Sequence, residues 1–349
     1  MNMLKVGESS PSERVQRAIE RAAHDTRARI GAGAAVAARA AVAAAKVARA
    51  GDDRGGPSRG YRLRRKENPV AGVERIAYGR IDDALDHARD HDADPVASVH
   101  EVRKDLKKLR SLLRLVRPSI PKRIYRRENV RYRDLGRELA GARDAEVKLQ
   151  TLKGLREISG DLEGVEAYAA ALDAERAGAG VSAADAELAI AELEGARKAV
   201  PDWSPTNGWR PPGPGFVRAY RRGREALAAV QADPADEAVH EWRKRSKDLW
   251  YHLRIVRRAW PEALEPLADE AHELSDLLGD HHDLAVLADD VSGRDDRFDD
   301  GAQGDLLAAI RRRQAELLDD ALPLGERLYA ERPKPFGKRL DAYWRAKKR

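Results

Sequence analysis

Apolar residues recur at spacings of three and four along most of this chain, which is the period of an α-helix with one buried face. Two such runs stand out in its first half: Val73, Ile76, Ala77, Ile81, Ala84 and Leu85, followed by Leu106, Leu109, Leu113 and Val116. No stretch shows the strict alternation of apolar and polar residues that marks a half-buried strand. The pattern therefore predicts an all-α protein.

Two stretches rich in glycine and proline interrupt the helical pattern. Residues 51–60 read GDDRGGPSRG, and residues 201–215 hold five prolines and three glycines. Because such stretches neither continue a helix nor form a central strand, they predict boundaries. We expect an Ala-rich basic helix (residues 12–50) and a flexible linker within residues 1–60, and a helical domain at residues 61–349. The linker 201–215 would divide this domain into halves, 61–200 and 216–349.

Composition narrows the class of protein. The chain has 349 residues, 42% of them apolar, which is enough for cores of normal size, and it has no cysteine. A disulfide framework and a cysteine-ligated metal are therefore excluded. The most apolar window, residues 30–50, is built on alanine and contains Arg39 and Lys46. A mid-span arginine costs roughly 2.5 to 3.5 kcal/mol, so we expect no membrane span and a cytoplasmic location.

An internal repeat is the most informative feature of the sequence. Residues 99–121 align with residues 239–261 at a constant offset of 140, and twelve of the 23 positions are identical. The similarity extends outward, since Tyr78, Arg80 and Leu85 match Tyr220, Arg222 and Leu227, and Leu135, Leu139, Asp144 and Val147 match Leu274, Leu278, Asp283 and Val286. The repeat predicts two homologous helical bundles.

The repeated helix has one apolar and one basic side. At 100° per residue, the first copy places Arg103, Lys104, Lys107, Arg110 and Arg114 within about 120° of arc around His100. The second copy repeats this basic stripe with His240, Arg243, Lys244, Lys247 and Arg254, and Tyr251 falls on the same side. A single basic stripe is usually only a solvated surface, but its duplication at matched positions favours a binding role.

Positive charge is concentrated in these two helices. Residues 100–117 and residues 240–258 each contain seven Lys+Arg and two Asp+Glu, so together they carry +10, whereas the whole chain carries +6. If the two stripes face each other, their repulsion destabilises the free protein until an anion neutralises it. Arginine offers bidentate forks, lysine a point charge and histidine a donor to phosphate oxygens. The pattern indicates a long anionic ligand.

The segment Asp280-His281-His282-Asp283 has the residue types of a metal site. In the first repeat its equivalents are Gly141, Ala142, Arg143 and Asp144, so only the last aspartate recurs. We therefore expect no catalytic metal and give Asp144 and Asp283 structural roles. The nucleotide-binding loops and the nucleophile elbow are also absent from the sequence. The expectation is a protein without a cofactor that is not an enzyme.

These residues resemble the CHAD family of histidine-containing α-helical domains. The resemblance spans about residues 61–349 and rests on four segments. The first is Val99-His100-x-x-Arg103-x-x-x-Lys107-Lys108-Leu109-Arg110, and the second is Leu139 to Val147 with Arg143-Asp144. The third is Val239-His240-x-x-Arg243-Lys244-x-x-Lys247-x-Leu249-x-Tyr251, and the fourth is Leu278-Gly279-x-x-His282-Asp283. Departures from the family pattern are Lys107 and Lys108 in place of arginine, Trp250 in place of a basic residue and Arg254 in place of an acidic one.

The resemblance implies two pseudo-symmetric four-helix bundles around a central basic groove or pore that binds inorganic polyphosphate, typically at polyphosphate granules and near granule-associated proteins. It implies no attached triphosphate-tunnel enzyme, whose strand signature this chain lacks. The residues expected to hold successive phosphates are His100, Arg103, Lys104, Lys107, Arg110, Arg114, His240, Arg243, Lys244, Lys247, Tyr251 and Arg254, extended by Arg80, Arg137, Arg143 and Arg222.

Two other hypotheses stay open. One is a phosphohydrolase or phosphotransferase, in which His281, His282 and Asp283 would help to hold a metal. The other is non-specific nucleic-acid binding, for which the basic segment 12–50 is the best argument. The stripes offer only Trp242 and Tyr251 for base stacking, which counts against the second hypothesis. The segment 12–50 could also target a granule surface or dimerise.

Overall fold

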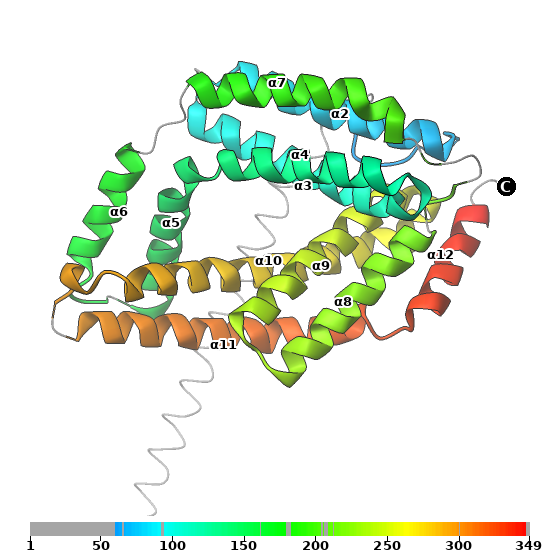
Figure 1. Ribbon diagram of the computed structural model, residues 1–349. Coiled ribbons are helices and arrows are strands. Elements are labelled where there is room, and N and C mark those ends of the chain that lie inside the picture. Colours follow the sequence, from blue (N-terminus) through cyan, green and yellow to red (C-terminus); the bar gives the residue numbers. More distant parts are fainter. Residues whose placement is uncertain are drawn as a thin grey trace, which may run out of the picture. The chain divides into compact units, whose positions relative to one another are not determined.

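The computed structural model describes residues 60–64, 66–91, 94–160, 162–178, 183–203, 205, 209–211, 213–299 and 301–346. Eleven α-helices and no strands occur in these ranges, which confirms the all-α prediction (Figure 1). The helices are α2 (Pro69–Arg89), α3 (Pro95–Val116), α4 (Lys122–Glu138), α5 (Gly141–Ser159), α6 (Glu166–Gly178), α7 (Ala183–Ala199), α8 (Pro214–Ala232), α9 (Asp236–Val256), α10 (Pro261–Ser292), α11 (Ala302–Leu328) and α12 (Pro333–Ala346). The helix expected at residues 12–50 lies outside the described residues.

The sequence fixes the starts of the first two described helices by capping. The side chain of Asn68 accepts a hydrogen bond from the amide of Val70 at the start of α2, and Asp94 accepts one from Ala97 at the start of α3. Proline follows each cap, where its missing N–H costs nothing. Residues Arg117–Ser119 continue α3 as a short 3₁₀ helix, η2.

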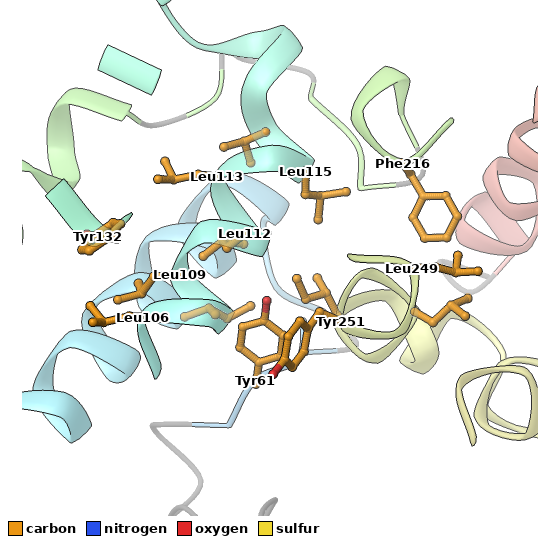
Figure 2. Packing of buried hydrophobic residues seen from close by; sticks show 14 of the residues in the cluster. Tyr61, Leu106, Leu109, Leu112, Leu113, Leu115, Tyr132, Phe216, Leu249 and Tyr251 are labelled. Carbon is orange, nitrogen blue, oxygen red and sulfur yellow. The ribbon is translucent and has the colours of Figure 1, made fainter. Parts of the chain in front are cut away.

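A first hydrophobic core joins both sequence halves. In it α2 packs on α3, α8 packs on α9, and α3 contacts both α8 and α9. The apolar side predicted for α3 is buried, since Val102, Leu106, Leu109, Leu113 and Val116 are at most 2% exposed. Tyr61 and Tyr251 meet edge to face between the halves, with ring centroids 5.7 Å apart (Figure 2). Trp203 and Trp209, from the expected linker 201–215, are also buried in this core.

A second, smaller core crosses the boundary drawn between the two halves. It contains apolar residues of α5 and α6 from the first half and of α10 and α11 from the second. The 32-residue helix α10 takes part in both cores, contributing Leu264 to Leu278 to the first and Leu284 to Val291 to the second. Packing therefore does not follow the sequence division at residues 201–215.

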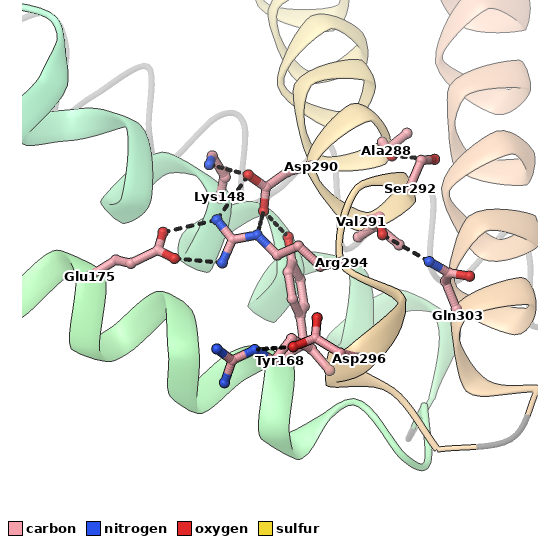
Figure 3. A network of polar contacts seen from close by, with 11 residues as sticks. Lys148, Tyr168, Glu175, Ala288, Asp290, Val291, Ser292, Arg294, Asp296 and Gln303 are labelled. Carbon is pink, nitrogen blue, oxygen red and sulfur yellow. Dashed lines mark hydrogen bonds and ion pairs between the residues drawn. The ribbon is translucent and has the colours of Figure 1, made fainter.

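A polar network attaches α5 and α6 to the end of α10 (Figure 3). Asp290 of α10 accepts hydrogen bonds from Lys148 of α5 and from the Tyr168 hydroxyl of α6, the latter at 2.9 Å. Arg294 pairs with both Asp290 and Glu175. Burial opposes ionisation of Asp290, but these hydrogen bonds outweigh it and hold the pKa of its carboxyl below the ordinary value. The network thus holds the helices of the second core together at its edge.

No helix in the described part of the chain is long and apolar enough to cross a membrane.

Candidate functional site

Polar residues gather where the two cores separate. Along α10, the segment between Leu278 of the first core and Leu284 of the second is Gly279-Asp-His-His-Asp283. In the first repeat, α4 ends at Glu138 and α5 begins at Gly141, so a short break stands where α10 continues unbroken. The basic sides of α3 and α9 reach this region.

The structure brings the two basic stripes together here. We call Arg103, Lys104, Lys107, Arg243, Lys244 and Lys247 the central cation cluster. Burial lowers the pKa of Lys107 to about 8, and the charges of Arg103 and Arg243 add to the effect. Burial lowers the pKa of Lys247 to about 7, with further contributions from Arg243 and Lys107. Cations of α3 and α9 therefore lie close enough to repel one another.

The cluster is enclosed by protein and still open to solvent. The Lys107 side chain is exposed, whereas the main cause of its lowered pKa is the protein around its ammonium group. Both observations fit an ammonium group that water reaches from one side only. Within the described ranges, Lys107, Arg243 and Lys247 form no ion pair. The more distant carboxylates of Asp276 and Asp283 offset only part of the repulsion.

The two matched arginines lie on matched turns of the repeat. Arg103 donates a hydrogen bond to the carbonyl oxygen of Leu139 at 2.8 Å, in the break between α4 and α5. Arg243 lies against Gly279 of α10, where an added Cβ would stand 3.6 Å from its Nε atom. Burial lowers the pKa of Arg103, and the charge of Asp144 opposes this. Each arginine is thus held beside the helix that follows its stripe.

Two histidine rings pack against each other in a tilted arrangement at the edge of the cluster. The rings of His240 and His282 have centroids 4.1 Å apart. Burial lowers the pKa of His282 to about 3, helped by the neighbouring His240 and Arg243, and burial beside Lys244 also lowers that of His240. Both rings are therefore neutral at pH 7. The Nδ1 atoms of His100 and His240 are buried and have no hydrogen-bond partner among the described residues.

The Asp280–Asp283 segment does not converge on one point. His281 lies near Asp236, with 3.8 Å between Nδ1 and Oδ1, whereas the His282 ring packs against that of His240. Across the described part of the chain, no three histidines or carboxylates are grouped so that they could hold a metal ion. His281 and His282 are adjacent in the sequence but contact different residues.

Arg80 and Arg222, expected to act alike, have different surroundings. Arg80 is 5% exposed and pairs with Asp105 at 3.0 Å and with Asp83. The position equivalent to Asp105 is Arg245, whose charge repels Arg222. Arg222 instead pairs with Glu241 at 3.2 Å and stays partly exposed.

The difference between the repeats extends to a pair of buried charges on α3 and α9. The first repeat buries Asp105 with Lys108, and the second buries Arg245 with Asp248, so the two charges exchange places. Arg80 is committed to this buried ion pair, and we correct its expected phosphate-binding role accordingly.

Tyr251 and Arg254 also require correction. Tyr251 is 5% exposed and stacks on Trp250 with centroids 4.5 Å apart. Arg254 is 7% exposed, and its guanidinium lies 5.3 Å from the Trp250 ring and 5.8 Å from the Tyr61 ring. Both side chains pack inside the core and do not reach an external ligand.

The remaining expected residues are Arg110 and Arg114, farther along α3, and Arg137 and Arg143, near the end of α4 and the start of α5. Arg110 hydrogen-bonds Asn129 at 3.4 Å, and its pKa falls to about 10 through burial and the charge of Arg114. Arg114 pairs with Asp248 at 2.8 Å. Arg137 is highly exposed near Asp134. The side chain of Arg143 lies outside the described residues.

Sequence reasoning missed three arginines near the far end of α3. Arg218 of α8 lies close enough to Arg117 and Arg221 for their charges to lower its pKa, although burial is the larger cause. Arg117 follows Arg114 by three residues and so continues the α3 stripe. This spacing was enough to predict from the sequence that Arg117 lies on the same side. Arg218 and Arg221 belong to a helix outside the stripe, so only the fold shows their proximity.

Comparison with known proteins identifies relatives of the fold. The family model described as the CHAD domain matches residues 76–291. PptA from Streptomyces chartreusis superposes with a TM-score of 0.54 at 16% identity, covering 75% of this chain and 99% of that one. The CHAD domain from the plant Ricinus communis gives 0.48 at 21% identity, covering 75% and 93%. No curated protein matches the sequence.

Proposed function

We propose that this chain, which belongs to the CHAD domain family, binds inorganic polyphosphate at the central cation cluster without acting on it as an enzyme. The observation that carries the proposal is that cations of both repeats lie close together: burial is the main cause of the lowered pKa values of Lys107 and Lys247, and the charge of Arg243 lowers both further. Folding has concentrated like charges, and a phosphate chain placed among them would neutralise them.

The proposal includes a pseudo-symmetric arrangement in which α3 and α9 line a central basic groove, each packed on the helix that precedes it. The matched positions of Arg103 and Arg243 support it, as does the pairing of α2 with α3 and of α8 with α9. His100 and His240 begin the two stripes, and the Nδ1 atom of each has no hydrogen-bond partner among the described residues. An imidazole N–H donates to a phosphate oxygen. Association with polyphosphate granules in the cytoplasm is part of the same proposal.

Binding without catalysis fits the chemistry of the cluster. Its arginines and lysines attract and orient phosphate groups, and the neighbouring His240 and His282 are neutral and packed on each other. A phosphoryl-transfer enzyme needs a metal or an activated nucleophile beside such cations. Release of inorganic phosphate from polyphosphate in the presence of magnesium or manganese would contradict this part of the proposal.

The test of the proposal is a titration of labelled long-chain polyphosphate at several salt concentrations, with duplex DNA as competitor. If the six cations each neutralise one phosphate, the log–log slope of affinity against salt should be roughly −4 to −5, by analogy with nucleic acids. We expect DNA to compete poorly. A slope near zero, or displacement of polyphosphate by equal amounts of DNA, would contradict the proposal.

Binding should take up protons and weaken as the pH rises from about 7 to 9. In the free protein Lys247 and Lys107 have pKa values of about 7 and 8, so much of their charge is lost across this range. A bound polyanion favours the ammonium forms and raises both pKa values, so protons enter from solution on binding. Affinity is thus highest below pH 7, where both lysines are already charged.

Calorimetric titrations at pH 7.5 in two buffers of different ionisation enthalpy measure this uptake. We expect different apparent binding enthalpies for the wild type and a smaller difference for a Lys107→Met, Lys247→Met variant. Equal enthalpies in both buffers for the wild type would show that the lysines do not take part.

A further inference from the structure

A second group of cations lies at the far end of α3 from Arg103. We call Arg117, Arg218 and Arg221 the distal arginine patch. Arg117 begins η2, directly after α3, and Arg218 and Arg221 lie one turn apart on α8. Burial lowers the pKa of Arg218, and the charges of Arg117, Arg222 and Arg221 lower it further. The three side chains therefore form one local concentration of positive charge.

A glycine brings the two parts of the patch together. An added Cβ at Gly215, in the first turn of α8, would stand 1.8 Å from the carbonyl oxygen of Leu115 in α3. Only a residue without a side chain allows this approach. Because Arg218 follows Gly215 by three residues and Arg117 follows Leu115 by two, the same contact places the arginines near each other. η2 and α8 also touch directly.

Little negative charge balances the patch. Within the described residues, neither Arg117 nor Arg218 forms an ion pair. The Arg117 guanidinium lies over the ring of Tyr125, 4.6 Å from its centroid. Arg221 lies 3.8 Å from Glu225, and both of these side chains are more than half exposed, so solvent screens the pair. The patch thus carries an excess of guanidinium groups, whose planar forks suit phosphate oxygens.

The distal arginine patch continues the row of cations that leaves the central cluster. Arg110 and Arg114 lie between them on the same side of α3, and the charge of Arg114 helps to lower the pKa of Arg110. From residue 103 to residue 117 the helix rises about 21 Å at 1.5 Å per residue. Midway, Asp248 pairs with Arg114 and also attracts Arg110, so the charge of these two arginines is partly balanced.

We infer that the distal arginine patch is a second phosphate subsite, which holds a distant part of the polyphosphate chain bound at the central cation cluster. This inference rests on the proposed function. A chain that reaches both subsites binds the second one intramolecularly, so its affinity exceeds that of a short chain without any new kind of contact. The protein would therefore favour long polyphosphate over tripolyphosphate.

The test compares tripolyphosphate with long-chain polyphosphate on the wild type, on an Arg117→Gln, Arg218→Gln variant and on a charge-matched control. The control is Arg311→Gln, Arg312→Gln, which removes two exposed arginines of α11. We expect the patch variant to lose about tenfold or more in affinity for the long chain and less than about twofold for tripolyphosphate bound at the central cluster. The control should keep the long-chain affinity, and thermal unfolding should show that all three proteins are folded.

Two results would overturn the inference. A patch variant that keeps the full long-chain affinity would show that the distal arginines do not touch the chain. A patch variant and control that lose equal affinity would show an effect of net charge alone. A failure of the proposed function itself would give a different result. In that case a Lys107→Met, Lys247→Met variant would bind long-chain polyphosphate as well as the wild type does.

Discussion

Replacing Lys107 and Lys247 together by methionine should weaken polyphosphate binding by about 100-fold or more at pH 7. Each lysine is expected to donate one hydrogen bond to a charged phosphate oxygen, and each such bond contributes roughly 1.5 to 3 kcal/mol. Methionine keeps the apolar stem and removes the charge. Fluorescence polarisation with labelled polyphosphate measures the loss.

The same variant should be at least as stable as the wild type when no ligand is present. The lowered pKa values mean that charging these lysines costs free energy in the folded protein, and methionine removes this cost. The cost is fully present below about pH 7 and disappears above the ordinary lysine pKa, so any gain in stability should shrink as the pH rises. Thermal unfolding at pH 6.5 and at pH 10 compares the two conditions.

A matched control separates local contacts from net charge. Lys153 of α5 and Lys338 of α12 are exposed and lie outside both cation groups. A Lys153→Met, Lys338→Met variant loses the same two charges and should bind polyphosphate within about threefold of the wild type. If both variants lose affinity equally, or if the cluster variant binds normally, the central cation cluster is not the binding site.

Replacing Asp248 by alanine should destabilise the protein by about 3 to 5 kcal/mol, which is the usual cost of leaving a buried charge without its partner. Asp248 is 2% exposed and pairs with Arg114 at 2.8 Å and with Arg245 at 3.0 Å. Arg245 is itself buried and, among the described residues, would keep only Glu241 as an ion-pair partner. Chemical denaturation of the wild type and the variant measures the difference in the free energy of unfolding.

An exposed ion pair provides the control for this prediction. Asp202 pairs with Arg127 at 2.9 Å, and both side chains are largely open to solvent. Asp202→Ala should therefore change the free energy of unfolding by no more than about 1 kcal/mol. An Asp248→Ala variant as stable as the Asp202→Ala variant would show that the inverted ion pairs do not stabilise the first core.

The sequence was sufficient to predict the all-helical class and the apolar side of α3. These features depend on local periodicity and on the repeat, and Leu106, Leu109 and Leu113 are buried as their spacing required. The repeat also paired Arg103 with Arg243, and both lie beside the helix that follows their stripe.

The errors arose where the surroundings of a helix face matter more than its periodicity. A helical wheel places Tyr251 and Arg254 on the basic side of α9, but Tyr61, from a segment before the repeat, covers them. Likewise, Arg80 and Arg222 align in sequence, yet the exchange of Asp105 for Arg245 buries one and leaves the other partly exposed. The packing of α5 and α6 on α10 depends on contacts between residues far apart in the sequence, which the periodicity of a single helix does not predict.

The most direct test of the central claim is a crystal structure of the protein with long-chain polyphosphate. We predict phosphate groups within hydrogen-bond distance of Lys107, Arg243 and Lys247, with the chain in contact with side chains from both α3 and α9. Phosphate density confined to other surfaces, with these three side chains facing only water, would contradict the account.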